Sequence, residues 1–422
     1  MATENKKYIP ALRFPEFQND GEWILTPVGK YYKVQGGFAF RSSEFKKSGT
    51  PIIRISNIPN EGIYIDISNS VYYDRIENEV NFLISKGDLL IAMSGATTGK
   101  TAVYNQIGKA YLNQRVGLFK SINSHNYYPF ICQWVKSNYF YAQLKRTLAA
   151  GAQPNISSKD IESFIWAYPN GNNSFAEQKK IADCLSSLDK YIDATKRKLE
   201  LLKEHKKGLM QRLFPAKGKT TPELRFPEFQ NDGEWQIVSL GEITSVVNRR
   251  NKSNRSLPIY SINNAEGFVP QSQQFAGMDS EARGYDISAY KIIGKHTFAY
   301  NPARINVGSI GYSGELKDIL ISSLYVCFKT MDNVDDDFLM CFFDSYIFNQ
   351  AVESNVEGGI RSYLFYENFS RINIAIPSLY EQKRIASCIT SIEDVIKQTN
   401  KQICLLETHK NGLLQQLFPK IK

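Results

Sequence analysis

Apolar side chains recur at alternating intervals of four and three residues in two segments of the chain, 177–215 and 381–419. In the first segment the repeated positions are Ile181, Leu185, Leu188, Ile192, Thr195, Leu199, Leu202, Lys206, Leu209 and Leu213. In the second they are Ile385, Ile389, Ile392, Ile396, Thr399, Ile403, Leu406, Lys410, Leu413 and Leu417. This spacing is the a/d pattern of a coiled coil, and it continues for about five heptads. It predicts two long helices, each followed by a Phe-Pro pair that ends it.

Each predicted helix would span roughly 55–60 Å and, on its own, would expose its apolar stripe to water. The simplest solution is that the two helices pack on each other, and a two-fold-like arrangement of the repeat makes them antiparallel. The polar seam residues Thr195, Thr399, Lys206 and Lys410 would lower stability but could fix the register. The alternative is that each helix packs only on its own domain.

Short β-rich runs separated by turn residues characterise the two regions 24–174 and 236–376. The runs lie at 51–58, 87–94 and 101–105 in the first region and at 257–263, 296–301 and 319–329 in the second. A helical stretch follows in each region, from about Tyr127 to Leu148 and from about Asp336 to Val352. Each region then has a Gly-led loop (151–164; 358–372) and a short run that ends at Pro169 or Pro377. This order predicts two α/β domains with a shared fold.

The two halves of the chain share their ends but not their middles. PALRFPEFQNDGEW at 10–23 returns at 222–235 with a single change, and the two helical segments align without a gap. Between these matched ends there is almost no shared sequence. A duplicated frame with different contents places two different domains in equivalent positions.

We therefore predict an α+β protein in which two α/β domains are linked by two long antiparallel coiled-coil helices, with an internal pseudo-two-fold repeat. The predicted divisions are residues 1–174 for the first domain, including 10–23, and 175–215 for the central helix. Residues 216–376, including 222–235, form the second domain, and 377–422 the last helix.

Composition favours a folded protein with a polyanionic partner. Apolar residues make up 42% and charged residues 22% of the chain, close to the average for globular proteins. The net charge of +9 indicates nucleic acid before membrane, although basic charge alone is a weak signal. The six cysteines contain no C-x-x-C pair, and the start lacks the pattern of a signal peptide. No apolar stretch approaches the ~20 residues that span a bilayer. We expect a cytoplasmic protein without disulfides, metal or membrane contact.

Three segments resemble catalytic motifs but lack essential residues. SGATTGKT at 94–101 resembles a phosphate-binding P-loop, yet Ser94 stands where glycine is needed, and a strand is expected to follow instead of a helix. Asn301-Pro302-Ala303-Arg304 lacks the second proline and the aromatic residue of the adenine methyltransferase motif. Glu-x-Lys triplets such as Glu204-His205-Lys206 are expected by chance in a chain of this length. We predict no active site.

Polar loops in both variable regions carry the side chains that read DNA bases: Arg pairs with guanine, and Asn or Gln with adenine. Lys, Ser and Thr would contact phosphates, which positions the protein but carries no sequence information. The predicted DNA-binding residues of the first region are Arg41, Thr97, Thr98, Lys100, Asn113, Gln114, Arg115, Gln153, Asn155, Ser157 and Lys159. Those of the second are Arg249, Arg250, Lys252, Asn301, Arg304, Asn306, Arg361 and Tyr363. Each residue taken singly is as well explained as an ordinary turn or surface residue.

At this point the chain resembles the specificity subunits of type I restriction-modification enzymes. The resemblance rests on the duplicated LRFPEF…GEW, on the duplicated EQK(K/R)IA helix that ends in LFP, and on the loops SGATTGK, LNQRVG, YNPARINVGSIG and GGIRSY. It implies two target recognition domains, each reading one half of a split, asymmetric double-stranded DNA site, with the paired helices fixing the spacer.

The resemblance further implies two methylation subunits and two restriction subunits as partners. These would use S-adenosylmethionine for N6-adenine methylation and ATP and Mg²⁺ for translocation and cleavage, so that this chain binds no cofactor and catalyses nothing itself. Two alternatives remain open. One is a similar DNA-reading subunit that serves a different effector, such as a fused modification-cleavage enzyme. The other is a coiled-coil scaffold without DNA function.

Overall fold

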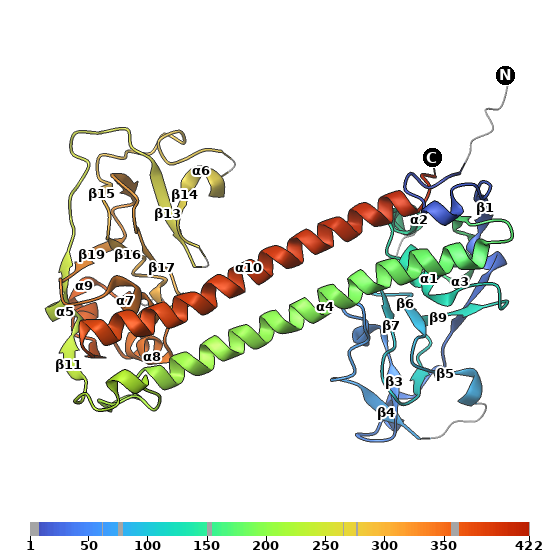
Figure 1. Ribbon diagram of the computed structural model, residues 1–422, viewed down its shortest axis with the longest axis horizontal. Coiled ribbons are helices and arrows are strands. Elements are labelled where there is room, and N and C mark those ends of the chain that lie inside the picture. Colours follow the sequence, from blue (N-terminus) through green and yellow to red (C-terminus); the bar gives the residue numbers. More distant parts are fainter. Residues whose placement is uncertain are drawn as a thin grey trace. The chain divides into compact units, whose positions relative to one another are not determined.

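The computed structural model describes residues 8–60, 62–74, 79–149, 154–264, 266–275, 277–355 and 363–421 (Figure 1). Contacts divide the chain into two compact units. Unit 1 consists of Met1–Lys198 and Thr399–Lys422, and unit 2 of Leu199–Gln398. The two long helices α4 (Ser174–Leu213) and α10 (Leu379–Leu417) therefore contribute one part to each unit.

The described residues of unit 1 form three sheets and three shorter α-helices. Its strands are β1 (Ile24–Pro27), β2 (Tyr32–Gly36), β3 (Thr50–Ile53), β4 (Val71–Tyr73), β5 (Leu83–Ile84), β6 (Leu89–Ala92), β7 (Thr101–Val103), β8 (Ala110–Leu112), β9 (Val116–Ser121) and β10 (Ile165–Tyr168). The shorter helices are α1 (Tyr128–Trp134), α2 (Asn138–Ala149) and α3 (Ser158–Ser163). The strand orders are β2-β9-β6-β7, β4-β3-β8-β5 and β1-β10.

Unit 2 repeats this arrangement with different residues. Its strands are β11 (Gln236–Ser239), β12 (Thr244–Val246), β13 (Ile259–Asn263), β14 (Gly267–Pro270), β15 (Lys291–Ile293), β16 (Phe298–Tyr300), β17 (Ile310–Tyr312), β18 (Ile319–Ile321), β19 (Val326–Thr330) and β20 (Asn373–Ile376). Its helices are α5 (Leu240–Ile243), α6 (Gln271–Gln274), α7 (Asp336–Phe343), α8 (Tyr346–Asn355) and α9 (Tyr366–Phe369).

The sheet topology confirms the prediction of one fold used twice. The orders β12-β19-β16-β17, β14-β13-β18-β15 and β11-β20 match those of unit 1 strand for strand. Even the parallel pairing within one four-stranded sheet of each unit is repeated, as β3 with β8 in the β4-β3-β8-β5 sheet and as β13 with β18 in the β14-β13-β18-β15 sheet. Two sequences with almost no identity therefore give the same mixed α/β domain.

Each predicted helical stretch after the sheets is two helices. The first breaks at Val135–Ser137, and the second at Asp344–Ser345. In unit 2 the Ser345 hydroxyl accepts a hydrogen bond from the Phe348 N–H at 3.2 Å. A serine in this position caps the N-terminus of the following helix and so starts a new one. The predicted helical stretches over 127–148 and 336–352 are confirmed as helical, and each contains a short break that the sequence pattern does not indicate.

The run at 319–329 is also two elements. Strand β18 ends at Ile321, a turn follows at 322–325, and β19 then enters the other four-stranded sheet. Period and composition alone do not distinguish one long apolar run from two short strands that change sheets.

The two long helices complete both cores. In unit 1 the core contains Ile181 and Leu185 near the start of α4. It also contains Leu414 and Leu417 at the end of α10 and Phe418 directly after it. In unit 2 the roles are exchanged, and the core takes in Ile385 and Ile389 of α10 and Met210, Leu213 and Phe214 near the end of α4. Each domain is therefore packed by both helices, and not by its own helix alone.

The two repeated motifs meet in a buried ion pair in each unit. The Arg13 guanidinium donates to both carboxylate oxygens of Glu177 at 2.7 and 2.8 Å, and their side chains are 5% and 1% exposed. Arg225 and Glu381 form the same bidentate pair at 2.8 and 2.7 Å. The arginine comes from LRFPEF and the glutamate from EQK(K/R)IA, which explains why the two motifs are duplicated together.

The glutamine of the second motif has a structural partner as well. Gln178 Oε1 accepts from the N–H of Tyr127, directly before α1, at 3.0 Å. Gln382 Oε1 accepts from the N–H of Asp335, directly before α7, at 2.9 Å. Both glutamines are buried. The repeated frame thus holds the first short helix of each domain against the long helix.

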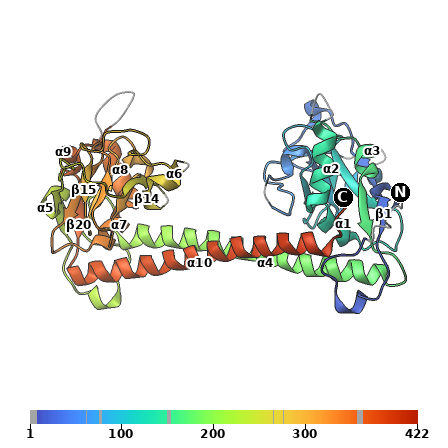
Figure 2. The same cartoon turned by 90° about the horizontal axis from the view of Figure 1, so that it is seen from above.

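Segments of α4 and α10 lie side by side within each unit and form the polar part of the seam (Figures 1 and 2). In unit 1 the Asp189 carboxylate pairs with Lys410 at 2.5 Å and with Lys136 at 2.7 Å. In unit 2 the Lys206 ammonium pairs with Glu393 at 2.5 Å and with Asp344 at 3.1 Å. The two clusters occupy equivalent positions, but unit 1 has one carboxylate between two lysines, and unit 2 one lysine between two carboxylates.

Candidate nucleic-acid interface

The P-loop-like segment is a hairpin loop. It connects β6 to β7, and the strand that follows it confirms the prediction and leaves no helix N-terminus to hold a phosphate. In unit 2 the loop of residues 301–309 connects β16 to β17 in the same way. Gly99 and Gly308 stand two residues before the returning strand, both with a φ of +83°, a conformation that favours glycine. Two segments with unrelated sequences are therefore the same structural element.

Three loops that carry predicted DNA-binding residues meet in unit 1. The Met93 N–H donates to the Arg115 carbonyl at 2.9 Å, and the Ile156 N–H donates to the Met93 carbonyl at 3.0 Å. These bonds join the loops 93–100, 113–115 and 154–159 around an open hollow of about 510 Å³. Its lining includes Gln114, Arg115 and Asn155. The second and third loops lie about 20 and 60 positions after the first in the chain, and the three loops thus form one surface.

The exposed side chains at this surface include Gln114, Arg115, Asn155 and Lys159. Arg115 forms no ion pair with another side chain in the described part of the chain. An exposed guanidinium next to an amide is the combination that pairs with base edges. We take the surface formed by loops 93–100, 113–115 and 154–159 as the candidate interface of unit 1.

Several other predicted residues are engaged within the protein. The Thr98 hydroxyl lies 2.5 Å from the Pro154 carbonyl and 2.6 Å from the Gly95 carbonyl, so it closes the loops. Ser157 caps α3, where its hydroxyl bonds both the carboxylate and the N–H of Asp160. Hydrogen bonds from the Ser157 hydroxyl and N–H lower the pKa of Asp160, and the partial burial of its carboxyl group opposes this shift only slightly. Both hydroxyls have a structural use already.

The remaining predicted residues of unit 1 are dispersed around these loops. The Asn113 side chain accepts from the Arg115 N–H at 3.3 Å, and the Thr97 hydroxyl lies 3.4 Å from the Ile55 carbonyl. Lys100 donates to the Asn60 carbonyl at 3.2 Å and lines a different cavity, next to α4. Arg41 is largely exposed and lies 3.5 Å from Glu44. Gln153 lies outside the described residues.

In unit 2 the hairpin loop 301–309 presents Arg304 and Asn306 at the surface. Its backbone is fixed, because the Arg304 N–H donates to the Asn301 carbonyl and the Ser309 N–H donates to the Arg304 carbonyl. The Asn301 side chain accepts from the Ala303 N–H at 3.0 Å, which stabilises the turn. Arg304 is therefore an exposed side chain on a well-defined support.

Tyr363 joins this surface from the third loop. The Leu364 N–H donates to the Pro302 carbonyl at 3.1 Å, the counterpart of the Ile156–Met93 bond in unit 1. Tyr363 stacks on Phe365 with ring centroids 5.7 Å apart and planes within 5°. Tyr363 occupies the position equivalent to Asn155. Arg361 lies outside the described residues.

The basic run before β13 lies along a different strand. The Ile292 N–H donates to the Arg249 carbonyl, and Arg250 forms a bridge with Lys291 at the edge of the β14-β13-β18-β15 sheet. The Arg249 guanidinium lies 3.8 Å from Asp318, and Lys252 is exposed. These three residues extend along the edge strand β15 and do not belong to the hairpin loop of Asn301 and Arg304.

One loop of the unit 2 surface is not predicted by the sequence pattern. Residues 322–325 occupy the position of Asn113–Arg115, and they include the exposed Leu324. The Lys291 ammonium donates to the Tyr325 carbonyl at 2.7 Å. Tyr300 pairs with Val326 in the β16–β19 ladder, so the loop that follows β16 begins next to the loop that precedes β19. Only an alignment of the two domains by structure could have identified it, since the run 319–329 reads as one strand.

The described residues contain no group of three His, Cys, Asp or Glu side chains that could hold a metal ion. Among the helices of these residues, none combines the length and apolar character needed to cross a membrane. All six cysteines are unpaired thiols.

Comparison with known proteins identifies the family. The model of the type I restriction modification DNA specificity domain matches the chain twice, over residues 23–204 and 232–407. The chain belongs to the type I restriction-modification DNA specificity family. Each match contains one of the two domains and most of the long helix that follows it, so the family pattern has the same period as the internal repeat.

The chain is similar over most of its length to type I specificity subunits of other organisms. The putative type I restriction enzyme MjaX specificity subunit of Methanocaldococcus jannaschii is 24% identical over 88% of this chain and 87% of its own length. The MjaVIII specificity subunit of the same organism is 22% identical over 98% of this chain and 95% of its own. The crystal structure of the type I restriction-modification S subunit from M. genitalium shares the fold, with a TM-score of 0.62 at 15% identity over 98% of this chain and all of that one.

Proposed function

We propose that this chain reads a bipartite, asymmetric DNA site, with one half-site read by each domain. In unit 1 the reading surface consists of loops 93–100, 113–115 and 154–159. In unit 2 it consists of loops 301–309, 322–325 and 363–366. Arg115 and Arg304 are the leading candidates for guanine contacts, because each is exposed and supported by a hydrogen-bonded loop.

One observation carries the proposal. Two domains of identical topology bring the same three loops together at the same ends of their strands, and these loops differ completely in sequence. Stability of the fold alone does not require the same frame to be combined with different loop sequences. Two readers of different sequences require this combination.

The proposed partners follow from the family. The chain itself would be non-catalytic and cytoplasmic. Two methylation subunits on the helical frame would transfer methyl groups from S-adenosylmethionine to the N6 of adenine, and two restriction subunits would use ATP and Mg²⁺ for translocation and cleavage. The structure of a related chain comes from work on complex assembly and conformational transition of the type I restriction-modification system (TM-score 0.51, 14% identity). That origin supports a role within a multisubunit complex.

Replacing Arg115 by alanine should relax the sequence preference of one half-site only. If this arginine is bidentate to a guanine, the loss is about 1–3 kcal/mol for that base pair, and the other half-site keeps its preference. Arg304→Ala should do the same to the other half-site. Selection of bound sequences from a random library, with the methylation partner present, measures both.

Lys159→Ala is the matched control, since an exposed lysine that contacts a phosphate should weaken binding to all sequences alike. A uniform loss for Arg115→Ala would make that arginine a phosphate contact. A single uninterrupted motif selected by the unmodified chain would contradict the bipartite proposal itself.

Lengthening both long helices should lengthen the spacer between the half-sites. Seven residues inserted after Lys198 and after Gln398 preserve the heptad pattern and add about 10 Å of helix. At about 3.4 Å per base pair, the spacer should grow by about three base pairs while both half-site sequences stay the same. Seven residues inserted at the exposed Ile107 should leave the spacer unchanged. An unaltered spacer in the double insertion would exclude the helices as the ruler.

A further inference from the structure

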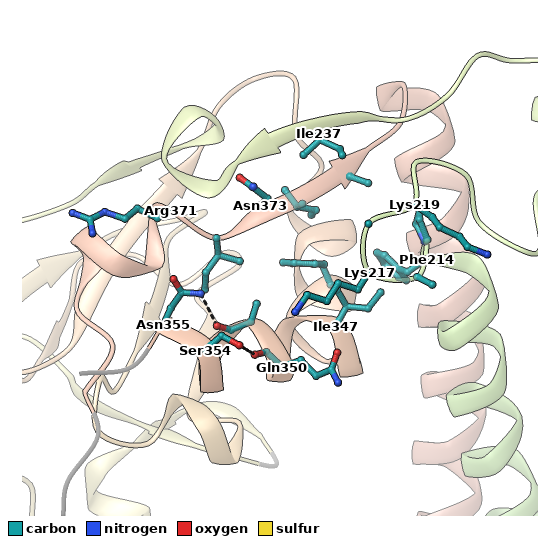
Figure 3. A pocket seen from close by; sticks show the side chains of 18 residues that line it. Phe214, Lys217, Lys219, Ile237, Ile347, Gln350, Ser354, Asn355, Arg371 and Asn373 are labelled. Atoms are coloured by element: carbon teal, nitrogen blue, oxygen red, sulfur yellow. Dashed lines mark hydrogen bonds between the residues drawn. The ribbon is translucent and has the colours of Figure 1, made fainter. Parts of the chain in front are cut away.

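A pocket in unit 2 lies outside the candidate interface, next to the loop that follows α4 (Figure 3). It has a volume of about 390 Å³. The loop 214–219 forms one wall, helix α8 a second, and strands β11 and β20 the third. Most of the lining is apolar, and it includes Phe214, Ile347 and Ile374.

In unit 1 the corresponding stretch of chain packs on the domain core. Leu213-Phe214-Pro215 aligns with Leu417-Phe418-Pro419, so Lys217 corresponds to Ile421. Ile421 packs against the core of unit 1. The strand residue Ile374 corresponds to the larger Trp166, which is fully buried in that core.

The neighbouring β-strand shows the same contrast between the units. Ile237 of β11 lines the pocket and is 53% exposed, although it is a large aliphatic side chain. Its counterpart Leu25 of β1 is half-buried and packs on the core of unit 1. The aliphatic side chain at this strand position is therefore partly covered in unit 1, as Leu25, and left open to solvent in unit 2, as Ile237.

The uncovered pocket has a cation at its entrance. In Figure 3 Lys217 extends into the pocket, whereas Lys219 and Arg371 point away from it. Arg371 is paired with Glu367 at 2.9 Å, whereas Lys217 forms no ion pair within the described part of the chain. A second cavity, of about 500 Å³, shares Lys217 and Ile347 and is bordered by Lys203, Lys206 and Lys207. An apolar floor with an ammonium rim suits an aliphatic side chain flanked by carboxylates.

We propose that this pocket binds a segment of the methylation subunit, which inserts one aliphatic side chain where Ile421 lies in unit 1 and places a carboxylate against Lys217. The proposal rests on the proposed function, since that function supplies the partner. Burial of an aliphatic side chain and of the exposed Ile237 would stabilise the complex by removing apolar surface from water. The segment itself is defined by its chemistry: a branched aliphatic residue next to Asp or Glu.

Lys217→Ile in the full chain tests the proposal, because it copies unit 1 and lets the chain fill its own pocket. Its dissociation constant for the purified methylation subunit should rise at least about tenfold. Lys217→Glu should weaken binding too, by repulsion, whereas Lys217→Arg should retain it. Lys219→Ile is the matched control: it makes the same chemical change on a side chain that points away, and its affinity should equal that of the unmodified chain.

Thermal unfolding of each variant verifies that the fold is intact. Unchanged affinity of Lys217→Ile, while the unmodified chain binds the methylation subunit, would overturn the pocket assignment and leave the proposed function standing. Equal weakening by Lys219→Ile would overturn it as well, since only general charge would then matter. Self-association of the unmodified chain that Lys217→Ile abolishes would assign the pocket to a second copy and so overturn the named partner. Failure of the unmodified chain to bind any methylation subunit would instead remove the proposed function.

Discussion

Replacing Glu177 by alanine is expected to lower the free energy of unfolding of unit 1 by about 3–5 kcal/mol, because it leaves the buried Arg13 guanidinium without its counter-charge. Arg13 donates two hydrogen bonds to this carboxylate, and Trp23 Nε1 donates a third at 3.2 Å. The loss should appear in urea unfolding followed by hydrogen exchange of peptides from unit 1.

Two controls separate this buried pair from ordinary surface charge. Glu381→Ala should destabilise unit 2 by a similar amount, because Arg225 is held in the same way. Glu16→Ala removes the partner of Lys180 from an exposed pair and should change little. Equal, small effects of Glu177→Ala and Glu16→Ala would mean that the two repeated motifs do not hold the domain together.

The second large effect is expected at the seam between the long helices. Asp189→Asn leaves two lysines, Lys136 and Lys410, facing each other in a mostly buried site, and should cost about 3–5 kcal/mol. The equivalent change Glu393→Gln should cost less, because Lys206 keeps a second carboxylate, Asp344. Unfolding of the two variants in parallel measures the difference. A larger loss for Glu393→Gln would contradict this account of the clusters.

The two clusters should also differ in their response to pH. Burial raises the pKa of Asp189, but Lys136 and Lys410 together lower it by more, so its folded-state pKa lies below the usual value of about 3.9. The stability it supplies is therefore present above about pH 4 and is lost as the pH falls through the lowered folded-state pKa.

The pKa values of the equivalent lysines Lys410 and Lys206 shift in opposite directions. Burial and the repulsion of Lys136 lower the pKa of Lys410, despite the attraction of Asp189. Burial alone would also lower the pKa of Lys206, but Glu393 and Asp344 raise it. The stability supplied by Lys206 is thus complete below its usual pKa of about 10.4 and is lost as the pH rises through the raised value.

The repeated frame was predictable because it depends on local signals. The heptad spacing predicts both long helices to within three residues at each end, and the Phe-Pro pairs mark their ends. The breaks at Ser137 and Ser345 were missed because a capping serine inside an apolar stretch resembles any other polar residue until its partner N–H is known. The partition of 319–329 depends on which sheet each strand joins, and this is a property of the whole domain.

The candidate site was predictable as a set of loops but not residue by residue. Turn residues and polar composition identify the loops at 94–100, 113–115 and 301–306. They do not reveal that the Thr98 hydroxyl bonds the Pro154 carbonyl, a residue far away in the sequence, or that Ser157 caps a helix. Hydrogen bonds of this kind distinguish side chains that stabilise the loops from side chains that are free to contact DNA. They become visible only in the folded structure.

The central claim is that two different readers share one duplicated frame, and mapping of methylated adenines in cells that carry the complete system tests it most directly. The account predicts two short defined sequences that differ from each other and are separated by a constant number of unspecified base pairs, with a modified adenine in each. A single continuous motif, or a spacer that varies from site to site, would contradict it.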